Sequence, residues 1–422
     1  MATICASLGQ MKFRAIKEAL HDARIPYDDI NPISILVWHD GLKDADYFSR
    51  LMPWQVVNRI PGINILCRKT PMSHLLARIQ IAFPELYNFV PRSFILPQQN
   101  QEFVATLKQT KKKYLIKPDM GSLGQGISII EPGEEYKLTE ELAVAQEYVE
   151  SYLINNTKFD LRVYVLLCSI KPLRIFVFRD GLARFCSEEY NSESKYAQLT
   201  NVSLNRDNPE MEIARISQLI SEIFPKMAQN GIDIDELWFK IENVIALTIL
   251  SAYGGLKMAE QWQCPAVGYP RCFQILGFDI LLDPDLNPTV LEVNYRPNLD
   301  YYRGKERRMK VRMIKEAIQI AVPYIKAQDI VLAKKWEMNG NLFKSTLFSN
   351  PKILKSAFKE RKKVLDKSLF SQVWPSDDPR REIWKDVINY ITSIPIESLP
   401  GLKIPHSYSE ALANEANDEA EK

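Results

Sequence analysis

Three oxygen-bearing side chains lie within two apolar segments in the second half of the chain, "QILGFDILLD" and "PTVLEVN". If these segments pair as a hairpin across the turn at 283–288, Asp279 lies opposite Glu292, and Asn294 shares their face. Two buried carboxylates require a neutralising cation, and oxygen ligands of this kind suit Mg²⁺ held jointly with phosphates. The alternative is a strand edge whose carboxylates face water, which the apolar neighbours on both strands disfavour.

A glycine-rich loop directly follows a lysine in "YLIKPDMGSLGQGISII", residues 114–130. Lys117 precedes Gly121, Gly124 and Gly126, but the spacing matches neither the P-loop nor the dinucleotide-binding fingerprint. The β-rich runs on both sides predict a hairpin lid. Backbone N–H groups of such a lid can approach phosphate oxygens, and Lys117 can add a point charge. Taken alone, the loop is better explained as a flexible hairpin tip.

The segment "KFDLRVY" alternates polar and apolar residues, as a strand does. Its period of two places Lys158, Asp160, Arg162 and Tyr164 on one face and apolar residues on the other. The alternative is a solvent-exposed face with cross-strand ion pairs. Together with the lid and the carboxylate hairpin, this ionic face predicts one site for a phosphate-bearing ligand and its metal.

The elements that must position these residues can be predicted from hydrophobic periodicity. Helices are expected over 11–25 and 71–83, and two more over 211–256, separated near Gly231. Strands are expected over 33–40, on both sides of the glycine loop, and over 143–151, 158–170, 172–185, 274–283 and 288–294. Beyond about residue 326 the pattern predicts helical fragments.

The composition excludes several classes of protein. The 422 residues are 46% hydrophobic and 25% charged, which is typical of a globular protein with about two or three domains. No run approaches the roughly 20 apolar residues of a membrane span, so we expect a soluble intracellular protein without a membrane partner. We also expect no nucleic acid as partner. The six cysteines form no metal or disulfide pattern. Two basic stretches, 303–315 and 352–367, indicate an acidic partner, unless they are only solvated helix faces.

From about residue 58 to 300 the chain resembles the ATP-grasp ligases and, within them, the tubulin tyrosine ligase-like family. The similarity is carried in order by "NRIPGINILCRKT", "IKPDMGSLGQGI", "AQEYV", "TKFDLRVYVLL", "QLTNVSLN" and "LEVNYRP". It implies an α+β fold of ATP-grasp architecture. We therefore expect a small N-terminal α/β domain (1–65), a central lid domain (66–151), a C-terminal catalytic domain (152–326) and a helical, partly basic appendage with an acidic tail (327–422).

The resemblance also implies ATP and Mg²⁺ as cofactors and assigns roles to residues. The Mg²⁺ ligands would be Asp279, Glu292 and Asn294, in agreement with the hairpin argument, and Arg162 and Arg184 would join Glu292 and Asn294 as catalytic residues. The nucleotide would be bound by Lys69, Lys117, Gly121, Ser122, Gly124, Gly126, Gln146, Glu147, Tyr148, Lys158, Asp160, Thr200 and Asn201.

Two positions depart from the family pattern. Gln198 stands where the family usually has a histidine, and a glutamine can form hydrogen bonds but cannot carry a proton charge. Arg296 and Asn298 replace smaller residues around Pro297. The first change bears on selection of the amino acid, and the second on the acceptor side.

The implied activity is an ATP-dependent ligation that joins a free amino acid to a carboxylate of a tubulin C-terminal tail through an acyl phosphate. Glutamate is the favoured amino acid, with glycylation and tyrosination as alternatives. A catalytically inactive protein that binds tubulin or microtubules is a further alternative, as is a different carboxylate acceptor. Such a protein would act in the cytoplasm, at the cytoskeleton or in a cilium or flagellum.

Overall fold

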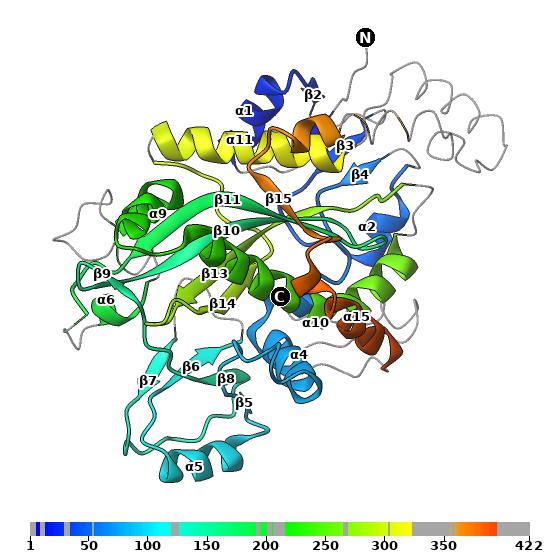
Figure 1. Ribbon diagram of the computed structural model, residues 1–422. Helices are drawn as coiled ribbons and strands as arrows, with labels where there is room; N and C mark the ends of the chain where they lie inside the picture. Colours follow the sequence, from blue (N-terminus) through cyan, green and yellow to red (C-terminus); the bar gives the residue numbers. More distant parts are fainter. Residues whose placement is uncertain are drawn as a thin grey trace.

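The computed structural model describes residues 6–8, 13–28, 34–52, 55–119, 126–190, 195–200, 205, 216–264, 269–302, 304–322, 355, 359 and 361–394. Within them the chain forms a mixed α/β structure with three sheets (Figure 1). No helix in these ranges is both long enough and apolar enough to cross a membrane.

The N-terminal residues form a small parallel sheet in the order β2-β1-β3-β4. Its elements are β1 (Ala6–Leu8), α1 (Arg14–Asp22), β2 (Tyr27–Asp28), β3 (Leu36–Trp38), α2 (Ala45–Ser49) and β4 (Val56–Val57). The helix expected over 11–25 and the strand expected over 33–40 are confirmed as α1 and β3. A bridge from Val57 to Cys272 connects this sheet to the central part of the molecule.

The central sheet has the order β12-β11-β10-β13-β14 and is antiparallel throughout. These strands are β10 (Thr157–Ser169), β11 (Arg174–Phe185), β12 (Ser217–Leu219), β13 (Gln274–Leu282) and β14 (Pro288–Asn294). The short β9 (Leu153–Ile154) pairs with the start of β10. The predicted strands over 158–170, 172–185, 274–283 and 288–294 are therefore confirmed.

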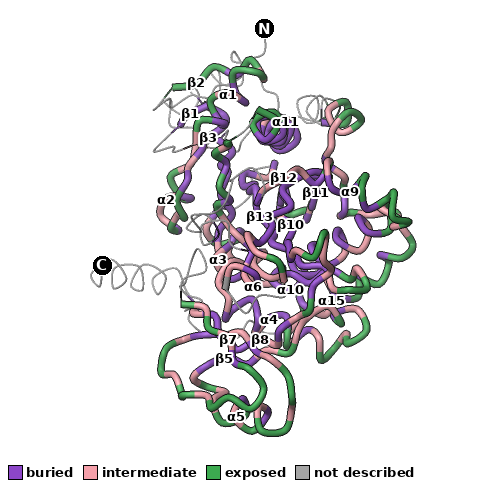
Figure 2. Tube along the Cα trace, turned by 90° about the vertical axis from the view of Figure 1, so that its left-hand side faces the viewer, coloured by how far each residue is buried: buried purple, intermediate pink, exposed green. Residues whose placement is uncertain are grey.

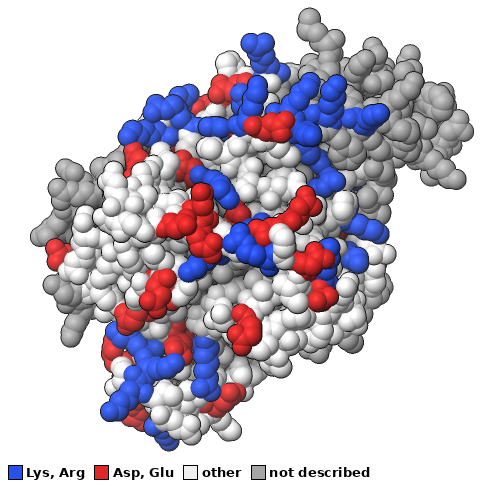
Figure 3. Space-filling model, in the orientation of Figure 1, with Lys and Arg blue, Asp and Glu red and all other residues white. Residues whose placement is uncertain are grey.

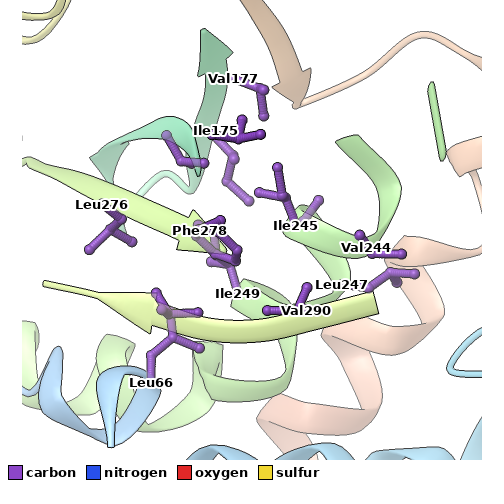
Figure 4. Close-up of a cluster of buried hydrophobic side chains, with 14 of the residues drawn as sticks. Leu66, Ile175, Val177, Val244, Ile245, Leu247, Ile249, Leu276, Phe278 and Val290 are labelled. Atoms are coloured by element: carbon purple, nitrogen blue, oxygen red, sulfur yellow. The ribbon is translucent and has the colours of Figure 1, made fainter. Parts of the chain in front are cut away.

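Helices cover both faces of this sheet because β10 is apolar on both faces along much of its length. Phe159, Leu161 and Val163 face the core beneath α9 (Ile220–Gln229) and α10 (Ile234–Gln263). Figure 4 shows another part of this core, where side chains of β11 and β13 meet those of α10. Tyr164 and Leu166 point the other way, into a second core under α11 (Gly304–Ala321). Figure 2 shows these buried segments at the centre of the molecule.

The lid is a separate four-stranded sheet of order β5-β8-β6-β7, below the central sheet in Figure 1. It contains β5 (Ser93–Leu96), α5 (Asn100–Gln109), β6 (Tyr114–Pro118), β7 (Ser128–Ile130) and β8 (Ala143–Glu147). β6 and β7 pair antiparallel, which confirms the hairpin predicted on either side of the glycine loop. Between the two sheets lie α3 (Asn64–Cys67) and α4 (Lys69–Ala82), the second being the helix expected over 71–83.

Two expectations about the remaining segments need correction. The first of the two helices expected over 211–256 begins only at Ile220, because residues 217–219 pair with β11 as β12; residues 211–215 lie outside the described ranges. The described part of the C-terminal segment is not a separate helical appendage. Its strand β15 (Phe370–Trp374) pairs with β11, and α15 (Trp384–Ser393), which follows the 3₁₀ turn η1 (Pro379–Arg381), packs on α10.

The physical reason for the second correction is the apolar surface of this segment. Phe370 and Val373 enter the two cores of the central sheet, and Trp384, Val387 and Ile391 recur at helical spacing on one buried face of α15. Arg381 also forms a buried ion pair of 2.8 Å with Glu242 of α10. The C-terminal segment is therefore part of the central domain in the residues described.

Candidate nucleotide and metal site

A pocket between the lid sheet and the central sheet brings together most of the residues singled out from the sequence. Its lining includes predicted residues from α4, β6, β8, β10, β11, β13 and β14, namely Lys69, Lys117, Gln146, Glu147, Tyr148, Lys158, Asp160, Arg184, Thr200, Asp279 and Glu292. Arg162 and Asn294 lie directly behind this lining, in contact with Asp279. Gly126 has a positive φ of 72° at the start of β7. The predictions at Gly121, Ser122, Gly124 and Asn201 fall outside the described residues.

The ionic face of "KFDLRVY" is buried, so the alternative of a solvent-exposed face is wrong. Lys158 and Asp160 are 5% and 2% exposed. They lie on the same face of β10 as Tyr164 and Leu166, but at the end of the strand that α11 leaves uncovered. One face of the sheet therefore has an apolar half beneath a helix and an ionic half beneath the lid.

Opposite charges alternate across the strands at this end of the sheet. Asp160 pairs in register with Arg184 on β11, which donates from Nε and Nη2 at 2.6 Å each. Arg162 pairs in register with Asp279 on β13, at 2.5 Å from Nε and 3.0 Å from Nη2. A third contact, 2.9 Å from Arg184 Nη2 to Asp279, links the two pairs. The two arginines are thus held in fixed positions, with Arg184 in the pocket lining and Arg162 directly behind it.

Asp279 lies directly opposite Glu292 in the β13–β14 hairpin, as predicted. Burial and the charge of Asp279 raise the pKa of Glu292, whereas the two arginines outweigh burial and lower the pKa of Asp279. Asp279 is buried and Glu292 is partly buried, which makes a cation the natural partner for their combined charge.

The donor set fits Mg²⁺. Two carboxylates and the Asn294 amide supply hard oxygens on one hairpin face, and Asp279 Oδ1 accepts from Arg162 Nε alone among the described residues, which leaves it acceptor capacity. Asp279 Oδ2 is already occupied by three donors, from Arg162, Arg184 and Asn294. Coordination would therefore use Glu292 and Oδ1 of Asp279.

Two buried lysines face this acidic end from opposite sides of the pocket, Lys117 on β6 and Lys158 on β10. Burial lowers the pKa of each ammonium to about 8, although nearby negative groups oppose the shift. Lys117 donates to Gln146 Oε1 at 2.6 Å across the lid sheet, which fixes its direction. A polyanion entering the pocket would stabilise both charges.

Sequence reasoning missed two groups of residues around the pocket. Asp119 accepts from the Thr70 backbone N–H and hydroxyl at 2.9 Å each and from Arg68, so it caps the start of α4 and fixes the neighbouring Lys69. The apolar wall consists of Leu115, Ile127, Val149, Leu199, Leu281 and Leu291. Leu281 could have been predicted, because a residue two positions from Asp279 shares its strand face. Leu291 could not, because it faces the pocket at a β-bulge, which the sequence pattern does not predict.

The two departures from the family pattern also have places in the structure. Gln198, at the end of α6 (Lys195–Gln198), lines the pocket beside Thr200. Arg296 and Asn298 follow the end of β14, and Pro297 packs closely above Gly277, where an added Cβ would lie 2.8 Å from the proline Cβ.

Comparison with known proteins identifies the relatives of this chain. The sequence model of the family described as "Tubulin-tyrosine ligase family" matches residues 48–330. A "Probable beta-tubulin polyglutamylase" of Tetrahymena thermophila is 27% identical over 420 residues, covering 92% of this chain and 35% of that protein. The "Tubulin polyglutamylase TTLL11" of Homo sapiens is 36% identical over 318 residues, covering 69% of this chain and 43% of that protein. The chain thus spans less than half the length of these two curated relatives.

Proposed function

The chain belongs to the tubulin-tyrosine ligase family, and from that membership we propose that it is an ATP-dependent ligase that adds glutamate to a carboxylate of a tubulin C-terminal tail. The observation that carries the proposal is the pocket, which is lined by two buried lysines, Arg184 and the Asp279–Glu292 pair, with Arg162 directly behind them. The choice of glutamate is supported by the two relatives above, which are named as tubulin polyglutamylases. Such an enzyme would work at the cytoskeleton, including that of cilia or flagella.

In the proposed reaction, ATP phosphorylates the acceptor carboxylate, the amine of glutamate attacks the acyl phosphate, and ADP and phosphate leave. Lys117 and Lys69 would bind phosphate oxygens, while Arg162 and Arg184 would balance charge on the transferring phosphoryl group and the acceptor carboxylate. Glu292, Asp279 and Asn294 would hold Mg²⁺, which would supply Lewis-acid stabilisation of the phosphate charge. No covalent nucleophile of the protein is required.

Capture of the acidic tail is proposed for a basic groove beside α11. The groove lies between α11 and the short helix at 361–365, and it unites the two basic stretches of the sequence; its cations are Arg307, Arg308, Arg312, Lys315, Lys363 and Lys367. Figure 3 shows Lys and Arg gathered along the upper edge of the molecule, where Figure 1 places α11. Because α11 covers the same face of the sheet that carries the ionic half of β10, a bound tail could run along this face to the pocket.

The test of the proposed chemistry is the isosteric change Glu292→Gln. We expect normal folding and a loss of ligase activity of about 100-fold or more, because one negative ligand of the metal is removed. Asp285→Asn makes the matching change at an exposed carboxylate in the turn of the same hairpin, and it should leave activity unaltered. Near-normal turnover by the Glu292→Gln variant would refute the metal assignment.

A further inference from the structure

A continuous chain of hydrogen bonds connects the buried Lys158 to the protein surface. Lys158 Nζ donates to the Tyr148 hydroxyl at 2.8 Å, the hydroxyls of Tyr148 and Tyr190 lie 3.2 Å apart, and the Tyr190 hydroxyl donates to Glu150 Oε2 at 2.5 Å. Lys158 lines the pocket, whereas Glu150 is exposed. None of the predictions from the sequence included Tyr190 or Glu150.

The direction of this chain follows from counting hydrogens. A tyrosine hydroxyl has one hydrogen, and that of Tyr190 is donated to Glu150. Tyr148 must therefore be the donor to Tyr190, which leaves its oxygen to accept from Lys158. All three bonds thus point from the ammonium to the carboxylate, an arrangement in which each bond polarises the next.

The chain also joins the lid to the central sheet. Tyr148 and Glu150 follow β8 of the lid, while Lys158 is the second residue of β10 and Tyr190 follows β11. Backbone hydrogen bonds hold the segments that carry Tyr190 and Lys158. The Tyr190 N–H donates to Asn156 O at 2.9 Å, and the Cys186 N–H donates to Lys158 O at 2.9 Å. Tyr190 therefore links Tyr148, at the end of β8 in the lid, to the residues at the start of β10.

Through this link Tyr190 holds Tyr148, whose hydroxyl is the only hydrogen-bond acceptor that the described residues offer to the Lys158 ammonium. The centre of the Tyr148 ring also lies 4.3 Å from Lys158 Nζ. An ammonium has three donors, so two remain for a ligand in the pocket. We propose that Tyr190 and Glu150 are positioning residues that fix Tyr148, and through it Lys158, as a contact to the nucleotide. The inference rests on the proposed function, since it takes ATP as the ligand of the pocket.

The experiment measures binding of a fluorescent ATP analogue and steady-state kinetics for the full chain and three variants. Tyr190→Phe removes one hydroxyl and should weaken nucleotide binding by about tenfold, with KM for ATP rising in parallel and kcat changing far less. Glu150→Gln keeps an acceptor but removes the charge, so we expect about threefold weaker binding. The double variant should be no weaker than Tyr190→Phe alone, because the chain is already interrupted.

Tyr27→Phe is the matched control, since Tyr27 is exposed on β2 and far from the pocket in sequence and fold. If Tyr190→Phe and Glu150→Gln both bind nucleotide as the unaltered protein does, the inference is wrong while the proposed function stands. If the effects of the two changes simply add, the two residues do not act through one chain, and the inference is likewise overturned. Failure of the unaltered protein to bind ATP would instead refute the proposed function and this inference with it. Because Glu150 is exposed, its variant remains informative even if Tyr190→Phe does not fold.

Discussion

Replacing Arg184 by methionine should destabilise the fold in a manner that depends on pH. The change removes three buried charge-assisted contacts, two to Asp160 and one to Asp279. Among the described residues it leaves Asp160 with Thr200 as its hydrogen-bond donor. Removal of one partner of a buried ion pair destabilises a protein by about 3 to 5 kcal/mol. Since Asp279 keeps Arg162, we expect the lower end of this range, about 3 kcal/mol, in the free energy of unfolding at neutral pH.

The pH dependence follows from Asp160. Burial raises the pKa of this carboxyl even with Arg184 present, and loss of the arginine must raise it further. A carboxyl whose pKa is higher in the folded than in the unfolded state binds more protons when folded, so stability falls as pH rises above the unfolded value of about 4. The destabilisation should therefore be smaller at about pH 5 than at about pH 8, as measured by equilibrium urea unfolding followed by tryptophan fluorescence.

Two further variants separate this reasoning from a packing effect. Arg184→Met combined with Asp160→Asn removes the unpaired charge and should be more stable than the single variant at about pH 8. Arg14→Met is the same substitution at an arginine whose side chain is 81% exposed, and it should change stability by about 0.5 kcal/mol or less. Equal destabilisation at both pH values, or a double variant no more stable than the single one, would refute the electrostatic account.

Three other predictions concern the groove, the C-terminal segment and the buried lysines. KM for tubulin should rise with ionic strength, and reversing the charge of Arg308 and Lys367 should weaken this dependence. The same change at the exposed Lys108 of the lid is the control and should leave the dependence unaltered. A KM that does not change with salt would contradict capture of the tail by charge. Truncation after residue 330 should give an unfolded or aggregated product, because several buried side chains of β15 and α15, each contributing about 1.5 to 3 kcal/mol, are lost from the main cores. A cooperative thermal transition in this truncated product would show that β15 and α15 are dispensable. ATP affinity should fall as pH rises through about 8, where the two pocket lysines lose their protons in the ligand-free protein, and an affinity that stays constant to about pH 9 would contradict their burial.

Much of the pocket could be predicted because period-two alternation fixes which residues share a strand face. Asp279 opposite Glu292 and the ionic row of Lys158, Asp160 and Arg162 follow from that rule alone. Burial of the row could not be predicted, since it depends on how the lid, a separate sheet, packs over the end of β10. The positioning chain was hidden for a similar reason, because Tyr148 and Tyr190 are 42 residues apart.

The C-terminal segment illustrates a different limit. Residues 370–374, "FSQVW", do not alternate polar and apolar residues, because the pairing with β11 shifts register at Val373. Their pairing is set by an edge of β11 that only the folded sheet provides. The helical spacing of Trp384, Val387 and Ile391 did carry a signal, namely one apolar face on α15 that needs a partner. The sequence alone does not reveal that α10 supplies it.

The central claim is that the pocket supports ATP-dependent addition of glutamate to tubulin tails. The most direct test is mass spectrometry of purified tubulin incubated with this protein, Mg-ATP and an equimolar mixture of glutamate, glycine and tyrosine, beside a reaction with the Glu292→Gln variant. We predict glutamate increments on a C-terminal tail peptide that require ATP and are absent with the variant. Increments of glycine or tyrosine would contradict the choice of amino acid, and tubulin left unmodified by the unaltered protein would contradict the claim itself.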